Sequence, residues 1–267
     1  MAGLSHIDMN AYNSVQLNER VAPVSEWLDS VPTPAVLPEW AAQFGLSIAP
    51  EHRSDAERVF GDMPLPPDLV KAVARRRFDF RAGRFCARRA LQAIACHHAD
   101  APLGRTGSGA VAWPSGVTGS ITHTREFVWA AVAASHDASA IGIDCEHVIS
   151  SERAHHVARA VAWACEVDAA RGANLDRLTA LTLVFSAKES FFKCVHSRVG
   201  RLFGFHDVRI VSVDAASRQF CVRVTKTLSS SLVCGSELTG RFAVDDGRVY
   251  TGMFLPPHRD ADRPRRT

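Results

Sequence analysis

The segment AIGIDCEHV, residues 140–148, is the feature that most limits how this chain can fold. Its β-branched residues predict a strand, and successive side chains of a strand point to opposite faces. The strand then has an apolar face with Ile141, Ile143 and Cys145, and a second face with Gly142, Asp144 and Glu146. One side of this strand must therefore pack on a core, while two carboxylates stay together on the other side.

The rest of the chain mixes helical and strand-like segments without regular alternation. Helical stretches are predicted at 67–98, 151–169 and 176–196, and strands at 120–124, 126–134, 208–214, 219–227, 237–247 and 249–255. This pattern predicts an α+β fold. We expect an N-terminal α+β subdomain at 1–140, whose first 65 or so residues form short strands and loops. A C-terminal α+β subdomain is expected at 141–256, and a disordered basic tail at 257–267.

Composition describes a soluble globular chain that remains in the cytoplasm. Hydrophobic residues make up 46% and charged residues 22% of the 267 residues, and the net charge of +3 is too small to indicate nucleic acid by itself. No apolar run reaches the ~18 residues of a membrane span, and the first residues lack the order of a signal peptide. The seven cysteines are scattered and never form C-x-x-C, which is typical of reduced thiols.

Asp144 and Glu146 share a strand face and would repel each other unless a cation or an arginine lies between them. Oxygen ligands at this spacing suit Mg²⁺, which commonly uses one or two carboxylates together with substrate phosphates. A solvent-exposed polar strand face is the alternative, and D-x-E taken alone favours that alternative.

The helical segment FSAKESFFK, residues 185–193, places charges tightly between phenylalanines. Glu189 stands four residues before Lys193, which on an exposed helix is a surface pair stabilising by only about 0.3–0.5 kcal/mol. That alternative leaves Phe185 and Phe192 unexplained. We therefore expect Lys188 or Glu189 to approach the core and to contribute to a site together with the 140–148 strand.

A basic stripe precedes both segments. Its four arginines, at helical spacings of 4, 3 and 4, are Arg77, Arg81, Arg84 and Arg88, with Arg76 and Arg89 nearby. Asp79 is the only acid in the stretch, so a phosphate-bearing ligand explains the stripe better than a solvated face. A nucleotide and a nucleic acid both remain possible at this point. His123, beside Thr122 in GSITHT, is a further candidate for donating a hydrogen bond to phosphate.

The segments GRFCAR, WPSGVTGSITHT, GIDCE and FSAKESFFK, in this order, resemble the 4′-phosphopantetheinyl transferases, and within them the broad-range surfactin and enterobactin type. The resemblance covers about residues 70–205 with strong motifs and extends more loosely to about 255. It implies two similar α+β halves related by a pseudo-twofold, with the active site between them. The implied reaction moves the phosphopantetheine arm of coenzyme A to a serine of an acyl or peptidyl carrier protein and leaves 3′,5′-ADP.

The resemblance also implies roles for individual residues. The metal ligands for Mg²⁺, with Mn²⁺ as a substitute, would be Asp144, Glu146 and Glu189. Coenzyme A contacts would come from Arg76, Arg84, Arg88, Arg105, Thr122, His123, Asp144, Lys188 and Lys193. The catalytic group would be Glu189, as base for the carrier serine, with Lys193 neutralising the leaving phosphate and Lys188 contacting phosphate. The resemblance favours a monomer that binds no nucleic acid and no membrane, with carriers docking near 198–205.

Two alternatives remain at the level of the sequence. A nucleic-acid-binding module would use the arginine stripe but leaves the three acids unexplained. A homologue that has lost catalysis and only binds carrier protein is the other, and the intact acids and lysines argue against it.

Overall fold

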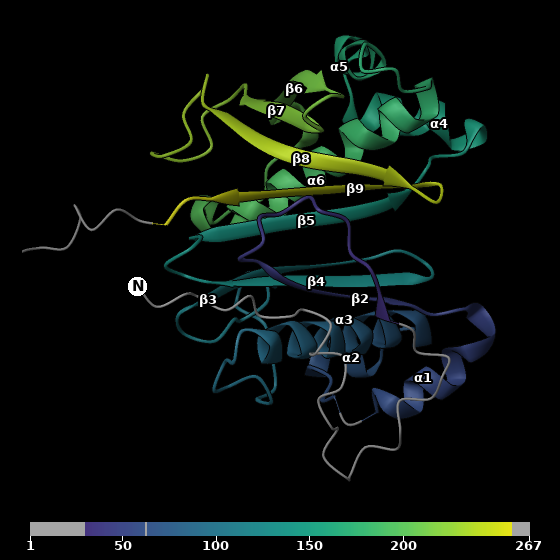
Figure 1. Ribbon diagram of the computed structural model, residues 1–267, viewed down its shortest axis with the longest axis vertical. Coiled ribbons are helices and arrows are strands. Elements are labelled where there is room, and N and C mark those ends of the chain that lie inside the picture. Colours follow the sequence, from purple (N-terminus) through teal and green to yellow (C-terminus); the bar gives the residue numbers. More distant parts are fainter. Residues whose placement is uncertain (1–29, 62, 258–267) are drawn as a thin grey trace, which may run out of the picture.

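The chain builds two antiparallel sheets that face each other across a shared core (Figure 1). A computed structural model describes residues 30–61 and 63–257, so the expected tail from 258 on lies outside the described residues. The first sheet has the spatial order β1 (Ser30–Val31), β2 (Ala42–Ser47), β4 (Phe127–Ala134), β3 (Val117–His123). The second has the order β5 (Ala140–His147), β9 (Arg248–Leu255), β8 (Glu237–Asp245), β7 (Gln219–Val224), β6 (Val208–Asp214). Helices and sheets together confirm the α+β class, whereas the pseudo-twofold and the subdomain boundaries stay predictions.

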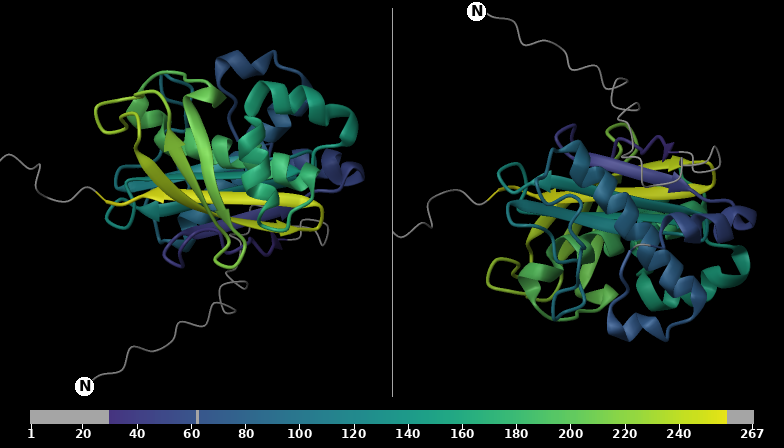
Figure 2. Two further views of the ribbon diagram at one scale, coloured as in Figure 1. Left: turned by 90° about the horizontal axis from the view of Figure 1, so that it is seen from above. Right: turned by 90° about the horizontal axis from the view of Figure 1, so that it is seen from below.

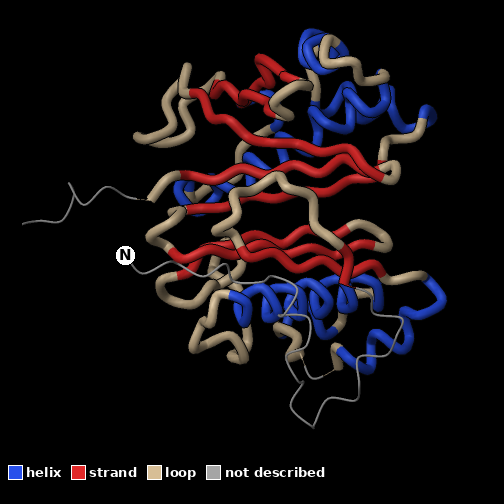
Figure 3. The backbone as a smooth tube through the Cα atoms, viewed as in Figure 1, coloured by secondary structure: helices blue, strands red, loops and turns tan. Residues whose placement is uncertain are grey.

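Each sheet is covered by one long helix. The helices are α1 (Arg53–Val59), α2 (Pro67–Val70), α3 (Ala74–Ala93), α4 (Ser151–Val161), α5 (Ala164–Arg171) and α6 (Arg177–Val199), with short 3-10 turns η2 (Pro50–His52) and η3 (Phe205–Asp207). In Figure 3, α3 lies along the outer side of the first sheet, and in the view from below in Figure 2 it crosses in front of the strands. Helix α6 packs against β5 and β9 of the second sheet. Within the described residues, no helix is long and apolar enough to cross a membrane.

Three helical expectations need correction. The stretch predicted at 67–98 is interrupted because Val73 is extended, with ψ 148°, so that α3 begins at Ala74. The stretch at 151–169 breaks at Trp163, whose backbone N–H donates to the Glu166 side chain and starts a new helix. Helix α1 forms in a region where only strands and loops were expected. Local side-chain capping and extended residues decide these boundaries, and apolar periodicity does not reveal them.

The strand β5 joins the two halves as the alternation of its side chains predicts. Its apolar face packs into a core cluster shared by both sheets, which also contains Trp129 of β4 and Tyr250 of β9. Those two rings meet edge to face at 6.2 Å between centroids. On the β3 side, Ser120 Oγ accepts a hydrogen bond from the backbone N–H of Ile143 at 3.2 Å. The halves are therefore held by a common core and by side chains that bridge β3 and β5.

Gly142 allows α6 to lie directly on β5. A Cβ atom at this position would overlap the backbone carbonyl oxygen of Ser190 and lie 2.6 Å from the backbone nitrogen of Cys194. Because both atoms belong to helix backbone, neither can move aside without shifting α6. This close approach sets the distance between the acids of β5 and the charged residues of α6.

We predict that Gly142→Ala destabilises the fold by about 3 kcal/mol or more, because the added methyl group overpacks a backbone contact. Urea denaturation followed by circular dichroism measures the change. Gly107→Ala is the matched control, since a Cβ at Gly107 meets nothing within 4 Å and should shift the free energy of unfolding little. Equal stabilities for the two variants would contradict this account of the β5–α6 contact.

Candidate active site

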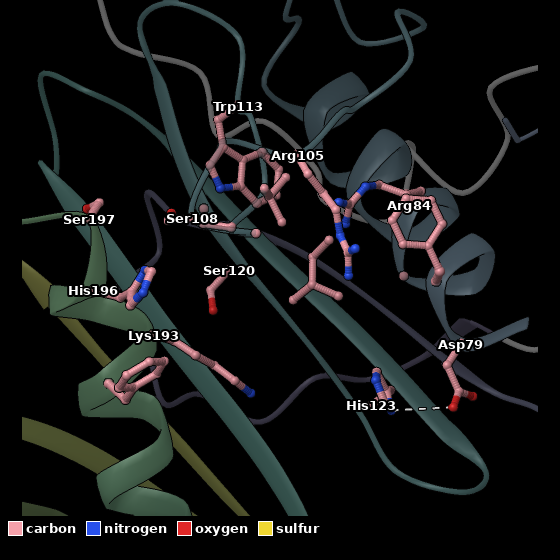
Figure 4. A pocket seen from close by; sticks show the side chains of 18 of the residues that line it. Asp79, Arg84, Arg105, Ser108, Trp113, Ser120, His123, Lys193, His196 and Ser197 are labelled. Atoms are coloured by element: carbon pink, nitrogen blue, oxygen red, sulfur yellow. Dashed lines mark ion pairs between the residues drawn. The ribbon is translucent and has the colours of Figure 1, made fainter. Parts of the chain in front are cut away.

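A cavity of about 720 Å³ opens between the two halves (Figure 4). The first half contributes residues of α3, of the loop 105–113 and of β3, and the second contributes residues of β5 and α6. Its charged and titratable lining includes Asp79, Arg84, Arg105, His123, Lys193 and His196. The cavity thus lies at the seam where the sequence resemblance places the active site.

Asp144 is the most connected acid beside this cavity. Its carboxylate is only 3% exposed, and Oδ1 accepts hydrogen bonds from Lys193 Nζ at 2.7 Å and Thr122 Oγ1 at 3.0 Å. Lys193 Nζ also donates to the backbone oxygen of Ile143 at 3.2 Å. Asp144 therefore links β3 of one half to α6 of the other, and the exposed polar face considered as an alternative does not exist at this residue.

The other two predicted metal ligands are electrostatically coupled to Asp144. Burial raises the pKa of the Glu146 carboxyl to about 7, and the negative charges of Asp144 and Glu189 add to this rise while Lys193 opposes it. Burial also raises the pKa of Glu189, with Lys193 opposing the rise and Asp144 adding to it. Three carboxyl groups therefore share one low-dielectric region next to the cavity.

The three carboxyl groups fit a hard cation by their chemistry. They offer only oxygen atoms, which Mg²⁺ prefers, and Asp144 Oδ2 is buried without a hydrogen-bond partner among the described residues. Over the same residues, however, no group of three or more His, Cys, Asp or Glu side chains is arranged to hold a metal ion. The ammonium of Lys193 forms an ion pair with the Asp144 carboxylate and is its positive partner in this arrangement.

Of the four arginines in the stripe only Arg84 lines the cavity, so the stripe as a whole does not form one wall of it. Three of its members bond within their own half: Arg77 to the Ala72 carbonyl, Arg81 to the Met63 carbonyl, and Arg88 to the Met63 sulfur. Of the four stripe residues, Arg84 lines the cavity, together with Arg75 and Arg76 from the same helix. Arg88, predicted to contact coenzyme A, lies outside the cavity lining because its guanidinium faces Met63.

The buried Arg84 and the half-buried Arg105 form a cationic wall of the cavity. Both guanidinium groups lie over the ring of Phe80, at 4.4 Å and 5.6 Å from its centroid. Burial, and then the positive charge of Arg105, lower the pKa of Arg84 to about 10. Arg105 pairs with Asp68 of α2 at 2.8 Å, whereas Arg84 donates to two backbone carbonyls of the loop at 103–104. Two adjacent cations, of which only Arg105 pairs with an acid among the described residues, favour an anionic ligand.

Phe80 lies at the cavity rather than in the core of the first half. It is half-buried and lines the cavity, and the guanidinium groups of Arg84 and Arg105 lie over its ring. Phe78 and Phe85 take the core positions instead. The sequence RRRFDFRAGRF offers three phenylalanines, and their spacing alone does not separate a core ring from a ring that supports cations.

His123 lines the cavity with Asp79 beside it, as Figure 4 shows. Its Nδ1 lies 4.0 Å from Asp79 Oδ2, and Asp79 also lies 3.6 Å from the Arg75 Nε atom. Burial lowers the pKa of His123, which the charge of Asp79 partly offsets. Thr122, its neighbour on β3, points to the opposite face and bonds Asp144 rather than lining the cavity.

Lys188 does not line the cavity, so the structure gives no support to its predicted contact with phosphate. Its side chain is fully buried and its Nζ lies 2.8 Å from Glu166 Oε1 of α5. The same atom donates to the backbone oxygens of Val161 and Phe205. Because adjacent residues of a helix point about 100° apart, Lys188 and Glu189 face different surroundings.

The raised pKa of Glu146 predicts a pH dependence of stability in metal-free protein. Between about pH 4.5 and about pH 7, the Glu146 carboxyl keeps a proton in the folded state that it has released in the unfolded state. Stability should therefore fall as the pH rises through that window. In urea titrations with EDTA, Glu146→Gln should make this slope shallower. The exposed Glu57→Gln should keep the wild-type slope, and an unchanged slope in Glu146→Gln would contradict the assignment.

Comparisons with known proteins agree with this geometry. The model of the 4'-phosphopantetheinyl transferase N-terminal domain matches residues 66–133, and the model of the 4'-phosphopantetheinyl transferase superfamily matches residues 140–245. The transferase Svp of Streptomyces mobaraensis is 31% identical over 247 residues, covering 83% of this chain and 88% of its own. PptT of Mycobacterium tuberculosis is 31% identical over 73% of this chain and 87% of its own. Enterobactin synthase component D of Salmonella typhi is 31% identical over 57% of this chain and 62% of its own.

These matches span both halves of the fold, and each half contributes residues to the cavity that Arg84, His123 and Lys193 line. The chain belongs to the 4′-phosphopantetheinyl transferase superfamily.

Proposed function

We propose that the protein transfers the 4′-phosphopantetheine group of coenzyme A to a serine of an acyl or peptidyl carrier protein and binds coenzyme A in the cavity between its halves. The observation that carries this proposal is one cavity lined by cations from both halves, Arg84 and Arg105 from the first and Lys193 from the second. Coenzyme A carries a phosphate on its ribose and, separately, a pyrophosphate, so cations from two sides of one cavity suit it.

The first half supplies the nucleotide end of the proposed site. Arg76, Arg84 and Arg105 would contact phosphate, since all three line the cavity. Arg84 is 8% exposed and is held by two carbonyls of the loop at 103–104, which fixes its guanidinium before a ligand arrives. A preorganised cation loses little conformational entropy on binding. His123, which lines the same cavity, would donate a hydrogen bond to the pyrophosphate.

The second half supplies the reacting end. Asp144, Glu146 and Glu189 would hold Mg²⁺, or Mn²⁺ in its place, and a bound cation would neutralise the charge that develops on the pyrophosphate oxygens. Lys193 lines the cavity and already bonds Asp144. Its ammonium would stabilise the departing 3′,5′-ADP phosphate as that charge forms.

Glu189 would accept the proton of the carrier serine hydroxyl. Its pKa is raised by burial, and a carboxylate with a raised pKa is a stronger base near neutral pH. The oxygen of the serine would then attack the β-phosphorus of coenzyme A, forming one P–O bond while the bond to the 3′,5′-ADP phosphate breaks. Lys188 has no part in this step, because Glu166 and two carbonyls use its donors.

The mouth of the cavity carries exposed apolar side chains from both halves. Val73 is 73% exposed and Leu202 is 78% exposed, and both belong to the lining. Leu202 lies in the 198–205 connector where carrier docking was expected, beside the exposed Arg201. An apolar rim next to a cation would suit the amphipathic, acidic helix of a carrier protein. We further propose that the protein acts as a cytoplasmic monomer.

Neither alternative function gains support. Nucleic-acid binding through the arginine stripe is disfavoured because Arg77, Arg81 and Arg88 bond to their own half. A homologue that only binds carrier protein would have no need of the Asp144–Lys193 pair beside the cavity. A salt-sensitive gel shift without coenzyme A binding would reinstate the first alternative.

Incubation with coenzyme A, Mg²⁺ and a panel of apo carrier proteins from fatty-acid, polyketide, peptide and siderophore synthesis tests the proposal. Mass spectrometry should show a gain of one phosphopantetheine on at least one carrier. Asp144→Ala should abolish that gain while the circular dichroism spectrum stays that of the wild type. No gain on any carrier would overturn the function, and a fully active Asp144→Ala would overturn the metal assignment.

Arg105→Gln should weaken coenzyme A binding by about tenfold, since a charge-assisted hydrogen bond to phosphate stabilises by about 1.5 kcal/mol. Isothermal titration calorimetry measures this change. Arg88→Gln on the same cationic half is the matched control, because its guanidinium faces Met63 and should leave the dissociation constant unchanged. The reverse result, with Arg88 affecting affinity and Arg105 not, would contradict the assignment of the cavity wall.

A further inference from the structure

The second half contains a buried ion pair that the proposed chemistry does not use. Lys188 of α6 and Glu166 of α5 are both 0% exposed at their side chains, and their charged atoms lie 2.8 Å apart. Burial lowers the pKa of Lys188, while the hydrogen bond and the charge of Glu166 oppose that shift. A buried ion pair often stabilises a fold no better than an apolar pair of similar volume. Its presence here therefore calls for a role other than stability alone.

Every polar atom of the pair has a partner, and the partners come from different elements. Lys188 Nζ donates to Val161 at the end of α4 at 2.9 Å and to Phe205 of η3 at 3.0 Å. Glu166 Oε2 accepts from the backbone N–H of Trp163 at 2.6 Å, and Oε1 accepts from that of Ile210 in β6 at 2.7 Å. One buried ammonium and one carboxylate thus fix α6 relative to α4, α5, η3 and β6.

We propose that Glu166 and Lys188 are positioning residues, which hold α6 in the rotation that directs Glu189 toward Asp144 and Glu146. Lys188 precedes Glu189 directly, so anchoring one side chain toward α5 fixes the direction of the next, about 100° further around the helix. The backbone contact at Gly142 sets how close α6 lies to β5, and the bonds of Lys188 to Val161 and Phe205 add a restraint on rotation about the helix axis. Lys188 is the anchor nearest to the proposed base.

The bond from Lys188 to Phe205 extends this role to the connector after α6. Phe205 also packs its ring against Phe185, at 5.7 Å between centroids, and Phe192 packs on Phe203 at 5.1 Å. These contacts hold the 200–207 segment, which includes Leu202 at the mouth of the cavity. The pair therefore positions both the proposed base and one wall of the entrance.

The inference rests on the proposed function, and a double variant tests it. Glu166→Gln combined with Lys188→Met removes both charges, so no unpaired charge is left buried, but it removes the anchor to Val161 and Phe205. We expect this double variant to bind coenzyme A at one site per chain. Its dissociation constant, measured without divalent cations, should lie within twofold of the wild-type value. The kcat for carrier modification, per coenzyme A binding site, should fall at least tenfold.

A matched control comes from the exposed pair Arg223–Glu237 on β7 and β8 of the same half, whose atoms lie 2.6 Å apart. Arg223→Met combined with Glu237→Gln should leave kcat and coenzyme A binding unchanged. If the double variant of the buried pair does not fold, Glu166→Gln combined with Lys188→Gln carries the test. It also leaves no unpaired charge buried and keeps polar groups at both positions, and it should show the same fall in kcat at unchanged coenzyme A affinity.

Three results would overturn the inference. An unchanged kcat per binding site would show that the pair serves stability alone. A tenfold weaker coenzyme A affinity would show that Lys188 contacts phosphate. Amide hydrogen exchange gives a third readout that needs no activity. Exchange at 188–194 should be faster in the double variant than in the wild type, while exchange in α3 stays unchanged. Equal rates at 188–194 in the two proteins would also count against the inference. A wild type that modifies no carrier would count against the proposed function instead.

Discussion

The carboxylate of Asp144 is the point on which the structure of the site depends. It is buried at the junction of the two halves, where Thr122 of β3 and Lys193 of α6 bond to the same oxygen atom. A buried carboxylate carries a desolvation penalty of several kcal/mol that its partners must offset, and Asp144 has a cation from α6 and a hydroxyl donor from the neighbouring half. One carboxylate thus connects the two halves beside the cavity.

Packing around β5 makes that arrangement possible. The apolar face of the strand is buried in the core shared with Trp129 and Tyr250, which leaves the opposite face to α6. Gly142 lets the helix backbone touch the strand there, and the charged residues of α6 come within reach of Asp144 as a result. The fold therefore assigns the two faces of one strand to different tasks, one to holding the halves together and the other to charge.

Sequence reasoning succeeded where a single periodicity decides the outcome. Alternation along 140–148 predicted which residues of β5 enter the core and which face the charged helix. It failed where partners come from distant segments. The spacing of the arginine stripe predicts a common face, but it does not reveal that Met63 and Ala72 bond three of its four members. Likewise nothing near Lys188 indicates that Glu166, on another helix, takes its charge.

We propose that Asp144 anchors a metal site that also involves coenzyme A. Titration of Mn²⁺ followed by electron paramagnetic resonance tests it most directly, because free and bound Mn²⁺ are measured without any catalytic step. We expect coenzyme A to tighten Mn²⁺ binding to the wild type. A mixture of Asp144→Ala and coenzyme A should bind no more Mn²⁺ than coenzyme A without protein. Equal Mn²⁺ binding by the wild type and Asp144→Ala would contradict it.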